Sequence, residues 1–490
     1  MTASRFVLAI DEGSTGVRAL LFDRQGVVRG SAYREIHASY PRPAWVEQDP
    51  ERIWDATLEV VGAAASVAAA TPRDLAAIGV TGQRSTAVAW HRRSGSPLHP
   101  AISWQDLRGT ERSNELLAEG HFVSPLSAAT KLEWMRRNSP AVRAALERDE
   151  ARFGTIESWL VAKLSGGRLH VTDPSYASTT GLYEFFENRW NTPFLDVLGI
   201  PETALPELRP SSERYGDTDP EIFGAPIPLA AIAGDQQAAM FGQLRLAPGE
   251  LKVSYGTSAM VDLNAGFAPL LSSHGAFPLV LWKLGEDTHY CLEGNAITAG
   301  ASITWLRDGL GLISAPEESA ALAASVADGG GVWMVPAFQG LGTPYLDPGA
   351  RAVVGGLSRA STRAHVIRAV LEGIALRSAE VVRALAADSP TGLPAVLRVD
   401  GGAARNDFLL QFQSDVLGIP VERPETLEAA ASGAAYLAGL AVGFWPDTEA
   451  LGRIWRLGKR FEPRMSEDER EARFARFTKQ VGVVRELSAI

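Results

Sequence analysis

A short polar loop with a carboxylate follows the first apolar segment of the chain. The apolar run 6–10 leads into Asp11-Glu12-Gly13-Ser14-Thr15-Gly16-Val17-Arg18, and a second apolar run occupies 17–22. This pattern predicts a strand, a tight turn and a second strand. Glycines allow close approach of a ligand, and Ser14 and Thr15 add hydroxyl donors beside backbone N–H groups, which suits a phosphate. Asp11 could hold Mg²⁺ through water. By itself, the same motif also fits an ordinary turn without a ligand.

A second loop of the same type lies roughly half a chain away. The segment 251–255 leads into Gly256-Thr257-Ser258, and an apolar run resumes at 259–263. Two such hairpins predict a duplicated domain that grips a nucleotide from both sides. Just upstream, the apolar run 229–233 and Gly234 deliver Asp235 to the start of a predicted helix over 236–243. A carboxylate there could accept a proton from an alcohol or simply cap the helix.

Further segments resemble, in the expected order, the FGGY carbohydrate kinase family, and most of all its glycerol kinase branch. These segments are Tyr40 to Pro50 (YPRPAWVEQDP), Thr81-Gly82-Gln83-Arg84, Trp104-Gln105-Asp106, Gly300-Ala301-Ser302-Ile303, Pro336-Ala337-Phe338, Gly342-Thr343-Pro344-Tyr345, Asp400-Gly401-Gly402-Ala403 and Gly433-Ala434-Ala435. The resemblance extends from about Phe6 to Trp445. It implies an α/β fold with two ribonuclease-H-like domains, of the actin and Hsp70 type, around a deep nucleotide cleft.

The resemblance also implies a site for ATP, Mg²⁺ and a small polyol or sugar. Asp235 is the expected catalytic acceptor of the substrate proton, and Asp11 and Asp235 are the expected metal-binding carboxylates. The polyol is expected to contact Arg84, Ser85, Trp104, Asp235 and Gln236, with Trp104 as an apolar wall. The nucleotide is expected to contact Ser14, Thr15, Arg18, Gly256, Thr257, Gly300, Thr304, Gly402, Ala403 and Asn406, with Asn406 at the adenine edge. Thr304 stands where the family has a glutamine, so that contact is expected to be altered.

The acceptor pocket departs from the glycerol kinase pattern at three positions, one of which is Met260 in place of a phenylalanine just past the second phosphate loop. Glycerol kinases typically read Gln-Arg-Glu where this chain has Gln83-Arg84-Ser85, and a tyrosine after a proline is Leu126 here. Loss of a hydroxyl-binding group should change discrimination between substrates. We therefore predict a terminal hydroxyl of glycerol or of a longer polyol, such as a tetritol, as the acceptor. A ketose such as xylulose is the alternative within the family, and an ATP-dependent scaffold of the actin or Hsp70 type is a remote one.

Composition restricts the other classes of partner. The chain of 490 residues carries 47 basic and 57 acidic side chains, a net charge of −10, and no dense basic run, so a nucleic acid or an anionic membrane is not expected. No secretory signal is evident, and a single cysteine, Cys291, excludes an internal disulfide framework. A cytoplasmic protein is expected. The family resemblance leaves a homodimer and a homotetramer as alternatives.

The predicted domain boundary lies where Ala247-Pro248-Gly249 interrupts the apolar pattern. Residues 1–246 would form the N-terminal FGGY kinase domain, with the substrate site and the first phosphate loop. Residues 247–490 would form the C-terminal FGGY kinase domain, with the second phosphate loop and the adenosine site. Apolar residues at helical spacing predict helices over 365–385 and 426–440, and the alanine-rich stretch 63–70 predicts one surface helix.

Overall fold

The computed structural model describes residues 4–488 and divides them into two compact units, neither of which is continuous in sequence. Within the described residues, the first unit contains 4–244, 279–289 and 430–454. The second contains 245–278, 290–429 and 455–488. No helix in the range 4–488 has the length and apolar character needed to cross a bilayer.

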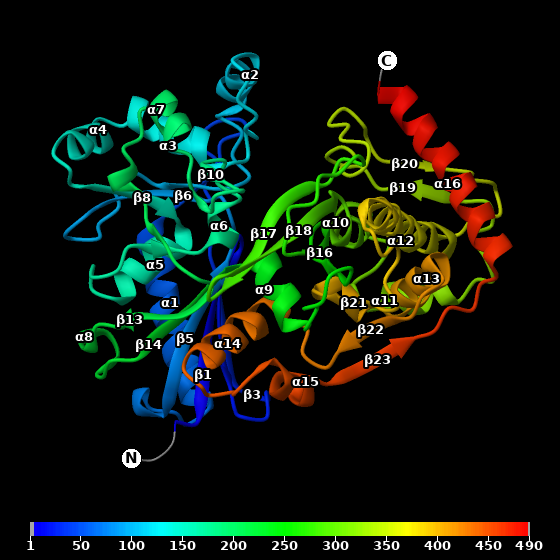
Figure 1. The fold of residues 1–490 in the computed structure, drawn as a ribbon. Helices are drawn as coiled ribbons and strands as arrows, with labels where there is room; N and C mark the ends of the chain where they lie inside the picture. Colours follow the sequence, from blue (N-terminus) through cyan, green and yellow to red (C-terminus); the bar gives the residue numbers. More distant parts are fainter. Residues whose placement is uncertain (1–3, 489–490) are drawn as a thin grey trace. The chain divides into compact units, whose positions relative to one another are not determined.

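A six-stranded mixed sheet forms the centre of the first unit (Figure 1). Its strands, in spatial order, are β13 (Ser212–Asp217), β14 (Pro228–Gly234), β5 (Leu75–Gly82), β1 (Phe6–Gly13), β2 (Gly16–Phe22) and β3 (Val28–Glu35). β1 runs antiparallel to β2 and parallel to β5, and β5 runs parallel to β14. Residues 6–10 of β1 are all buried, as expected for a strand in the middle of a covered sheet.

Helix α1 (Pro50–Val67) packs against β2 and β3. Asp49 caps its first turn by accepting from the Glu51 N–H, and Pro50 occupies the first helical position, where it needs no hydrogen-bond acceptor. The alanine-rich stretch 63–70 is therefore not a separate helix but the end of α1 and the turn that follows it. Ala69 has a φ of 47°, which ends the helix.

The remaining elements of the first unit surround this sheet. A four-stranded sheet has the order β4 (Glu47–Gln48), β7 (Ala101–Ile102), β6 (Ala87–His91) and β8 (Ala151–Thr155). The short paired strands are β9 (Val171–Thr172) with β12 (Glu207–Leu208) and β10 (Tyr183–Glu184) with β11 (Arg189–Trp190). The helices are α2 (Thr110–Ala118), α3 (Ala128–Asn138), α4 (Pro140–Glu147), α5 (Ile156–Leu164), α6 (Pro174–Ala177), α7 (Thr192–Leu198), α8 (Pro220–Phe223), α9 (Asp235–Gly242), α14 (Ala429–Ala441) and α15 (Thr448–Ile454).

Hydrogen bonds tie the two late segments to the first unit. Ser212 Oγ donates to Leu437 O at 2.7 Å, and the Trp445 indole N–H donates to Arg24 O at 3.0 Å. In the other segment, Ser211 N donates to Lys283 O at 2.8 Å. These bonds satisfy polar groups that would otherwise be buried without partners.

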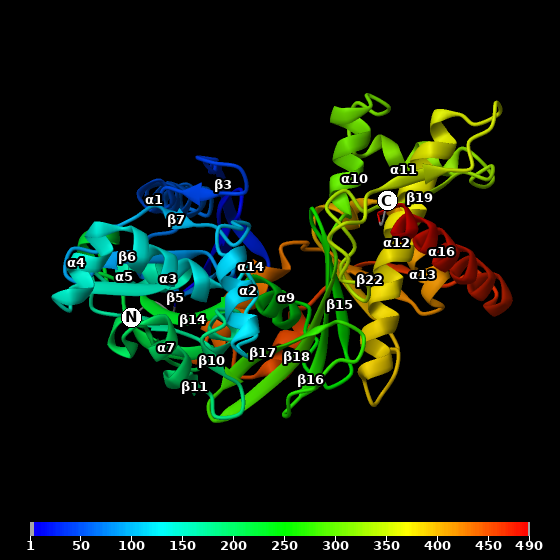
Figure 2. The ribbon, with the colours of Figure 1, turned by 90° about the horizontal axis from the view of Figure 1, so that it is seen from above.

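The second unit is built around a seven-stranded sheet (Figure 2). Its strands, in order, are β17 (Phe277–Leu284), β18 (Asp287–Ala296), β16 (Ala259–Gly266), β15 (Leu251–Tyr255), β21 (Leu397–Asp400), β22 (Val421–Pro424) and β23 (Leu457–Phe461). Residues 279–289, at the β17–β18 turn, are grouped with the first unit. The other elements are α10 (Gly300–Thr304), α11 (Glu318–Ala324), α12 (Arg363–Asp388), α13 (Asp407–Leu417), α16 (Glu467–Ser488) and the pair β19 (Trp333–Val335) and β20 (Val353–Gly355).

The two sheets share one strand order. When β13, β17 and β23 are set aside, both sheets place their strands in the order third, second, first, fourth and fifth along the chain. This order is β3-β2-β1-β5-β14 in the first sheet and β18-β16-β15-β21-β22 in the second. The directions also match, because β15 is antiparallel to β16 and parallel to β21, and β21 is parallel to β22. The expected α/β fold with two ribonuclease-H-like domains is thus confirmed, one mixed sheet in each.

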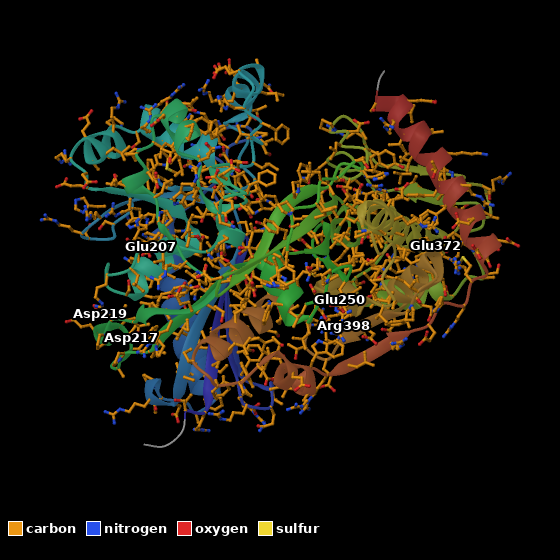
Figure 3. The ribbon with its side chains drawn as sticks, in the orientation of Figure 1. Glu207, Asp217, Asp219, Glu250, Glu372 and Arg398 are labelled. Carbon is orange, nitrogen blue, oxygen red and sulfur yellow. The ribbon has the colours of Figure 1, made fainter. Side chains whose placement is uncertain are left out.

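Charged side chains lie at the margins of both units (Figure 3). Asp217 ends β13, and Asp219 caps α8, at one edge of the first sheet. On α12, Glu372 pairs with Arg368 at 2.7 Å and with Arg473 of α16 at 3.7 Å. Both side chains of the Arg368–Glu372 pair are only 13% exposed, so this pair is partly shielded from solvent.

Candidate active site

Three parallel strands of the first unit end at the same edge of the sheet. The register places Glu12 of β1 beside Gly82 of β5, and Gly82 beside Gly234 of β14. The residues that follow these positions are the polar segments predicted from the sequence. The carboxyl edge of parallel strands is the usual position of ligand sites in α/β proteins.

Asp235 is the first residue of α9, with Gly234 as the N-cap, so the helix begins one residue earlier than predicted. Its Oδ1 lies 3.1 Å from Arg84 Nε and accepts from Gln236 N at 2.8 Å. Within residues 4–488, Oδ2 has no recorded hydrogen-bond partner. The Arg84 guanidinium and the Gln236 N–H group thus hold one oxygen of this carboxyl group in place. Asp235 therefore presents one oriented carboxylate oxygen that can accept a proton.

Arg84 follows β5 and lies across the turn before α9. Its side chain is only 13% exposed, and Nη1 is 3.4 Å from Gln237 Oε1. A Cβ on Gly234 would lie 2.7 Å from Arg84 Cδ, so the glycine leaves room for the arginine side chain. The structure thus brings Arg84, Asp235 and Gln236 together, as the sequence predicted. The absence of a side chain at Gly234 allows the Arg84 side chain to lie this close to the start of α9.

Asp11 lies at the end of β1, directly opposite Arg18 of β2 in the antiparallel register. The pKa of its carboxyl group is raised to about 6, mainly by burial and in addition by the nearby Asp235 charge, while Arg18 lowers it. Two carboxylates that repel one another in this way fit a divalent cation, because Mg²⁺ usually takes one or two carboxylates and completes its shell with water and phosphate oxygens. Within the described residues, no group of three metal-binding side chains occurs.

The first phosphate loop connects β1 and β2 through Ser14 and Thr15. Tyr33 of β3 donates to Thr15 O at 3.2 Å, and the Arg18 guanidinium lies 5.2 Å from the Tyr33 ring. Gln48 Nε2 donates to Ser14 O at 3.0 Å, and the Trp104 indole N–H donates to Ser14 Oγ at 2.7 Å. Trp104 was predicted as an apolar wall, and the structure adds this polar contact with the loop.

Ser85 has a left-handed backbone, with a φ of 60°, and it is 9% exposed. Its hydroxyl donates to Thr179 O at 2.9 Å. The fully buried Lys131 ammonium donates to Ser85 O at 3.2 Å and to Leu126 O at 2.6 Å, and burial lowers the pKa of Lys131 to about 7. One lysine thus holds both segments that depart from the family pattern.

In the second unit, backbone groups hold the corresponding loop. Gly300 N donates to Gly256 O at 3.0 Å, and Ala299 N and Ala301 N donate to Thr257 O at 3.0 and 3.1 Å. A Cβ on Gly300 would lie 3.8 Å from the Ala403 Cβ. The predicted residues Gly256, Thr257, Gly300 and Ala403 are therefore neighbours.

Asn406 and Thr304 have structural contacts of their own. Asn406 caps α13 by accepting from Leu409 N at 3.0 Å, and its Nδ2 donates to Ser319 Oγ at 2.9 Å. Thr304 ends α10, and its hydroxyl is 3.4 Å from Gly300 O. With both ends of the Asn406 carboxamide engaged, its predicted role at the adenine edge requires either an additional, bifurcated contact or the loss of one of these bonds.

Sequence reasoning missed the buried polar residues behind the site. Gln83 donates to both oxygens of Glu12, at 2.9 and 3.0 Å, and also to Gln48 at 2.9 Å. Gln83 and Gln48 are each 2% exposed and Glu12 is 1% exposed. Both glutamines lie in segments that carried the family resemblance, and that placement was the only signal available for them.

Comparison with known proteins agrees with this architecture. Residues 6–242 match the N-terminal domain, and residues 251–442 the C-terminal domain, of the FGGY family of carbohydrate kinases. The chain is 49% identical to a glycerol kinase of Dechloromonas aromatica, over 96% of each chain, and 48% identical to one of Bordetella parapertussis, over 98% of this chain and 97% of that one. A crystal structure of Plasmodium falciparum glycerol kinase with ADP superposes with a TM-score of 0.91 at 29% identity, covering 99% of both chains. The chain therefore belongs to the FGGY family of carbohydrate kinases and is a phosphotransferase with an alcohol acceptor.

Proposed function

We propose that this chain transfers the γ-phosphoryl group of Mg·ATP to a terminal hydroxyl of a polyol, giving a polyol phosphate and ADP. The observation that carries the proposal is the oriented carboxylate of Asp235, held by Arg84 at the sheet edge that also carries the first phosphate loop. The similarity to glycerol kinases over nearly the whole chain supports the same reaction class.

In the reaction, the polyol oxygen attacks the γ-phosphorus, the new O–P bond forms and the bond to the β,γ-bridging oxygen breaks. Asp235 Oδ2 accepts the hydroxyl proton as the bond forms, since phosphoryl transfer depends on positioning and on a nearby base. Arg84 binds a substrate hydroxyl and keeps Asp235 in place. Gln236 and the face of Trp104 complete the acceptor site.

Residues 1–246 bind the polyol and, through Ser14, Thr15 and Arg18, the phosphates. Residues 247–490 bind phosphate at Gly256 and Thr257 and adenosine near Gly300, Thr304, Gly402, Ala403 and Asn406. Mg²⁺ bound by Asp11 and Asp235 would neutralise phosphate charge.

The polyol itself is glycerol or a somewhat longer one. Where the resemblance leads one to expect a glutamate, Ser85 offers a hydroxyl that already donates to Thr179 O, and Leu126 presents an apolar side chain that is 39% exposed. Both differences remove side chains that could hydrogen-bond the hydroxyls of a small triol, and they leave volume for a further carbon atom of the substrate. A tetritol is therefore the substrate that we favour.

A coupled assay of ADP release tests the proposal with glycerol, erythritol, D- and L-threitol, the pentitols, xylulose and ribulose. A higher kcat/KM for a four- or five-carbon polyol than for glycerol is expected. The double variant Ser85→Glu/Leu126→Tyr should shift the ratio back toward glycerol by about tenfold or more. A clear preference of the unaltered enzyme for glycerol would limit the proposal to a glycerol kinase, and turnover of ketoses alone would overturn it.

A further inference from the structure

Five hydrogen bonds form a closed ring behind the first phosphate loop. They run from Gln83 Nε2 to Gln48 Oε1 (2.9 Å), from Gln48 Nε2 to Ser14 O (3.0 Å), from Trp104 Nε1 to Ser14 Oγ (2.7 Å), from Trp104 N to Thr86 Oγ1 (3.1 Å) and from Thr86 Oγ1 to Gln83 Oε1 (2.9 Å). The ring joins the loop to the two turns that carry Arg84 and Trp104. It therefore connects the segments expected to hold phosphate with those expected to hold polyol.

Donor and acceptor roles around the ring are fully determined. Gln83 Nε2 uses one hydrogen for the Glu12 carboxylate and the other for Gln48, so its oxygen is left to accept from Thr86. The Thr86 hydroxyl hydrogen points to Gln83, so its oxygen can accept from Trp104 N. Gln48, Gln83 and Thr86 are 2%, 2% and 0% exposed, and a satisfied buried network of this kind is rigid.

Ser14 is a partly exposed member of the ring and lies in the loop to which the proposed function assigns phosphate. Its Oγ accepts from the Trp104 indole, which can only donate, so the Ser14 hydroxyl hydrogen must point elsewhere. Within residues 4–488 no acceptor is recorded for that hydrogen. A phosphate oxygen is an acceptor without hydrogens, and it is the partner that this orientation suits.

We propose that Trp104 is a positioning residue for the nucleotide, because its indole N–H holds Ser14 as a hydrogen-bond donor toward phosphate while Gln48 holds the loop backbone. The proposal rests on the function proposed above, which assigns phosphate to the Ser14 loop and polyol to the face of Trp104. One side chain then contacts the polyol with its ring and the phosphate loop with its N–H. Binding of the two substrates is coupled through it.

A double-mutant cycle tests this link on the full chain, by calorimetry with Mg²⁺ and AMP-PNP in the absence of polyol. Trp104→Phe keeps an aromatic wall but removes the N–H donor together with one edge of the ring system. It should raise the Kd about fivefold, as expected for the loss of one hydrogen bond, and Ser14→Ala should raise it about tenfold. The double variant should match Ser14→Ala alone within about twofold, because both changes remove the same interaction.

Trp282→Phe is the matched control. Trp282 is 1% exposed, and its indole nitrogen has no hydrogen-bond partner within the described residues, so this variant loses a ring edge and no bond. Its Kd should equal that of the unaltered protein. Melting temperatures identify any variant that fails to fold. A further variant, Gln48→Met, breaks the ring at another hydrogen bond and should also raise the Kd for AMP-PNP.

The outcomes separate the two proposals. Effects of Trp104→Phe and Ser14→Ala that multiply in the double variant, or an unchanged Kd in Trp104→Phe, would overturn the positioning role. If the cycle is non-additive but no polyol is phosphorylated, the positioning role stands and the proposed function fails. If Trp104→Phe changes only the KM for the polyol and leaves the Kd for AMP-PNP unchanged, Trp104 contacts the polyol but does not position the nucleotide.

Discussion

The two phosphate-type hairpins have the same topology but are held by different chemistry. In the first unit, the Ser14–Thr15 loop depends on buried side chains, with Gln48 and Trp104 bonded directly to Ser14. In the second unit, the Gly256–Thr257 segment depends on backbone N–H groups of residues 299–301. The strand before the first loop carries Asp11 and Glu12 just before its last residue, Gly13, whereas the strand before the second loop ends in Ser254 and Tyr255.

This difference indicates how a duplicated fold can divide one task. Charged and hydrogen-bonding side chains can move protons and bind cations, which fits the catalytic role that we propose for the first unit. Backbone donors and small residues allow a close approach with little dependence on protonation, so the second unit is suited to nucleotide recognition. The following variants test that division, from the largest expected effect to the smallest.

Removing the proton acceptor should have the largest effect. Asp235→Asn keeps the size of the side chain but cannot take up the alcohol proton, so kcat should fall on the order of 10³-fold. Calorimetric affinity for Mg·AMP-PNP should change by less than about tenfold, since Asp11 and the two phosphate loops remain to bind the metal and the phosphates. Asp217→Asn, at the margin of the same sheet, is the control and should leave kcat unchanged. A kcat for Asp235→Asn close to that of the control would remove Asp235 from the mechanism.

Adjacent glycines in the second unit test its dependence on backbone packing. Gly401 has a φ of 85°, and a Cβ there would lie 2.5 Å from Tyr255 O, so Gly401→Ala should cost roughly 3–4 kcal/mol in the free energy of unfolding. Gly402 has no atom within 4 Å of such a Cβ, so Gly402→Ala should change stability by less than about 0.5 kcal/mol. Denaturant unfolding measures both. A lowered nucleotide affinity in the stable Gly402→Ala variant would show that a ligand approaches this backbone.

A buried carboxyl in the first unit should make its stability depend on pH. Burial raises the pKa of Glu157 from 4.5 to about 7, despite the Thr172 and Thr155 hydroxyls that donate to Oε1 at 2.7 Å. Below pH 4.5 both folded and unfolded states are protonated, and above pH 7 the folded state carries a buried charge. Glu157→Gln should therefore have little effect near pH 4.5 and should stabilise the protein increasingly up to pH 7, by at most about 3 kcal/mol. Melting temperatures at pH 5 and pH 8 measure this, and an equal shift at both values would contradict it.

The smallest effect is expected at Asn406. Asn406→Ala removes the cap of α13 and should cost about 1 kcal/mol. Asn406→Asp keeps the cap and loses only the donor to Ser319, so its cost should be smaller. Asn406→Asp, which keeps the cap, should leave the nucleotide affinity unchanged if Asn406 is only a cap. If the affinity falls in both variants, Asn406 also contacts adenine, as the sequence predicted.

Much of the fold and part of the site could be predicted from local patterns. The strand 6–10 and the helix over 236–243 follow from apolar runs and turn residues, and the structure gives β1 as Phe6–Gly13 and α9 as Asp235–Gly242. The expected helix over 365–385 is α12, Arg363–Asp388, because apolar spacing persists along its length. The alanine-rich stretch 63–70, predicted as one surface helix, is helical only to Val67 and belongs to the longer α1, because alanine continues a helix without marking where it starts or ends.

Two glycine-containing hairpins and a carboxylate before a helix, each after a buried strand, could be predicted from the residues alone, because turn chemistry and strand periodicity act over a few residues. The tertiary structure alone decided which distant side chains meet. The Trp104–Ser14 bond joins residues 90 positions apart, and residues 279–289 and 430–454 belong to the first unit although they lie far along the chain. Such contacts form only when the sheets assemble, since a buried donor takes whichever acceptor the packing brings within reach.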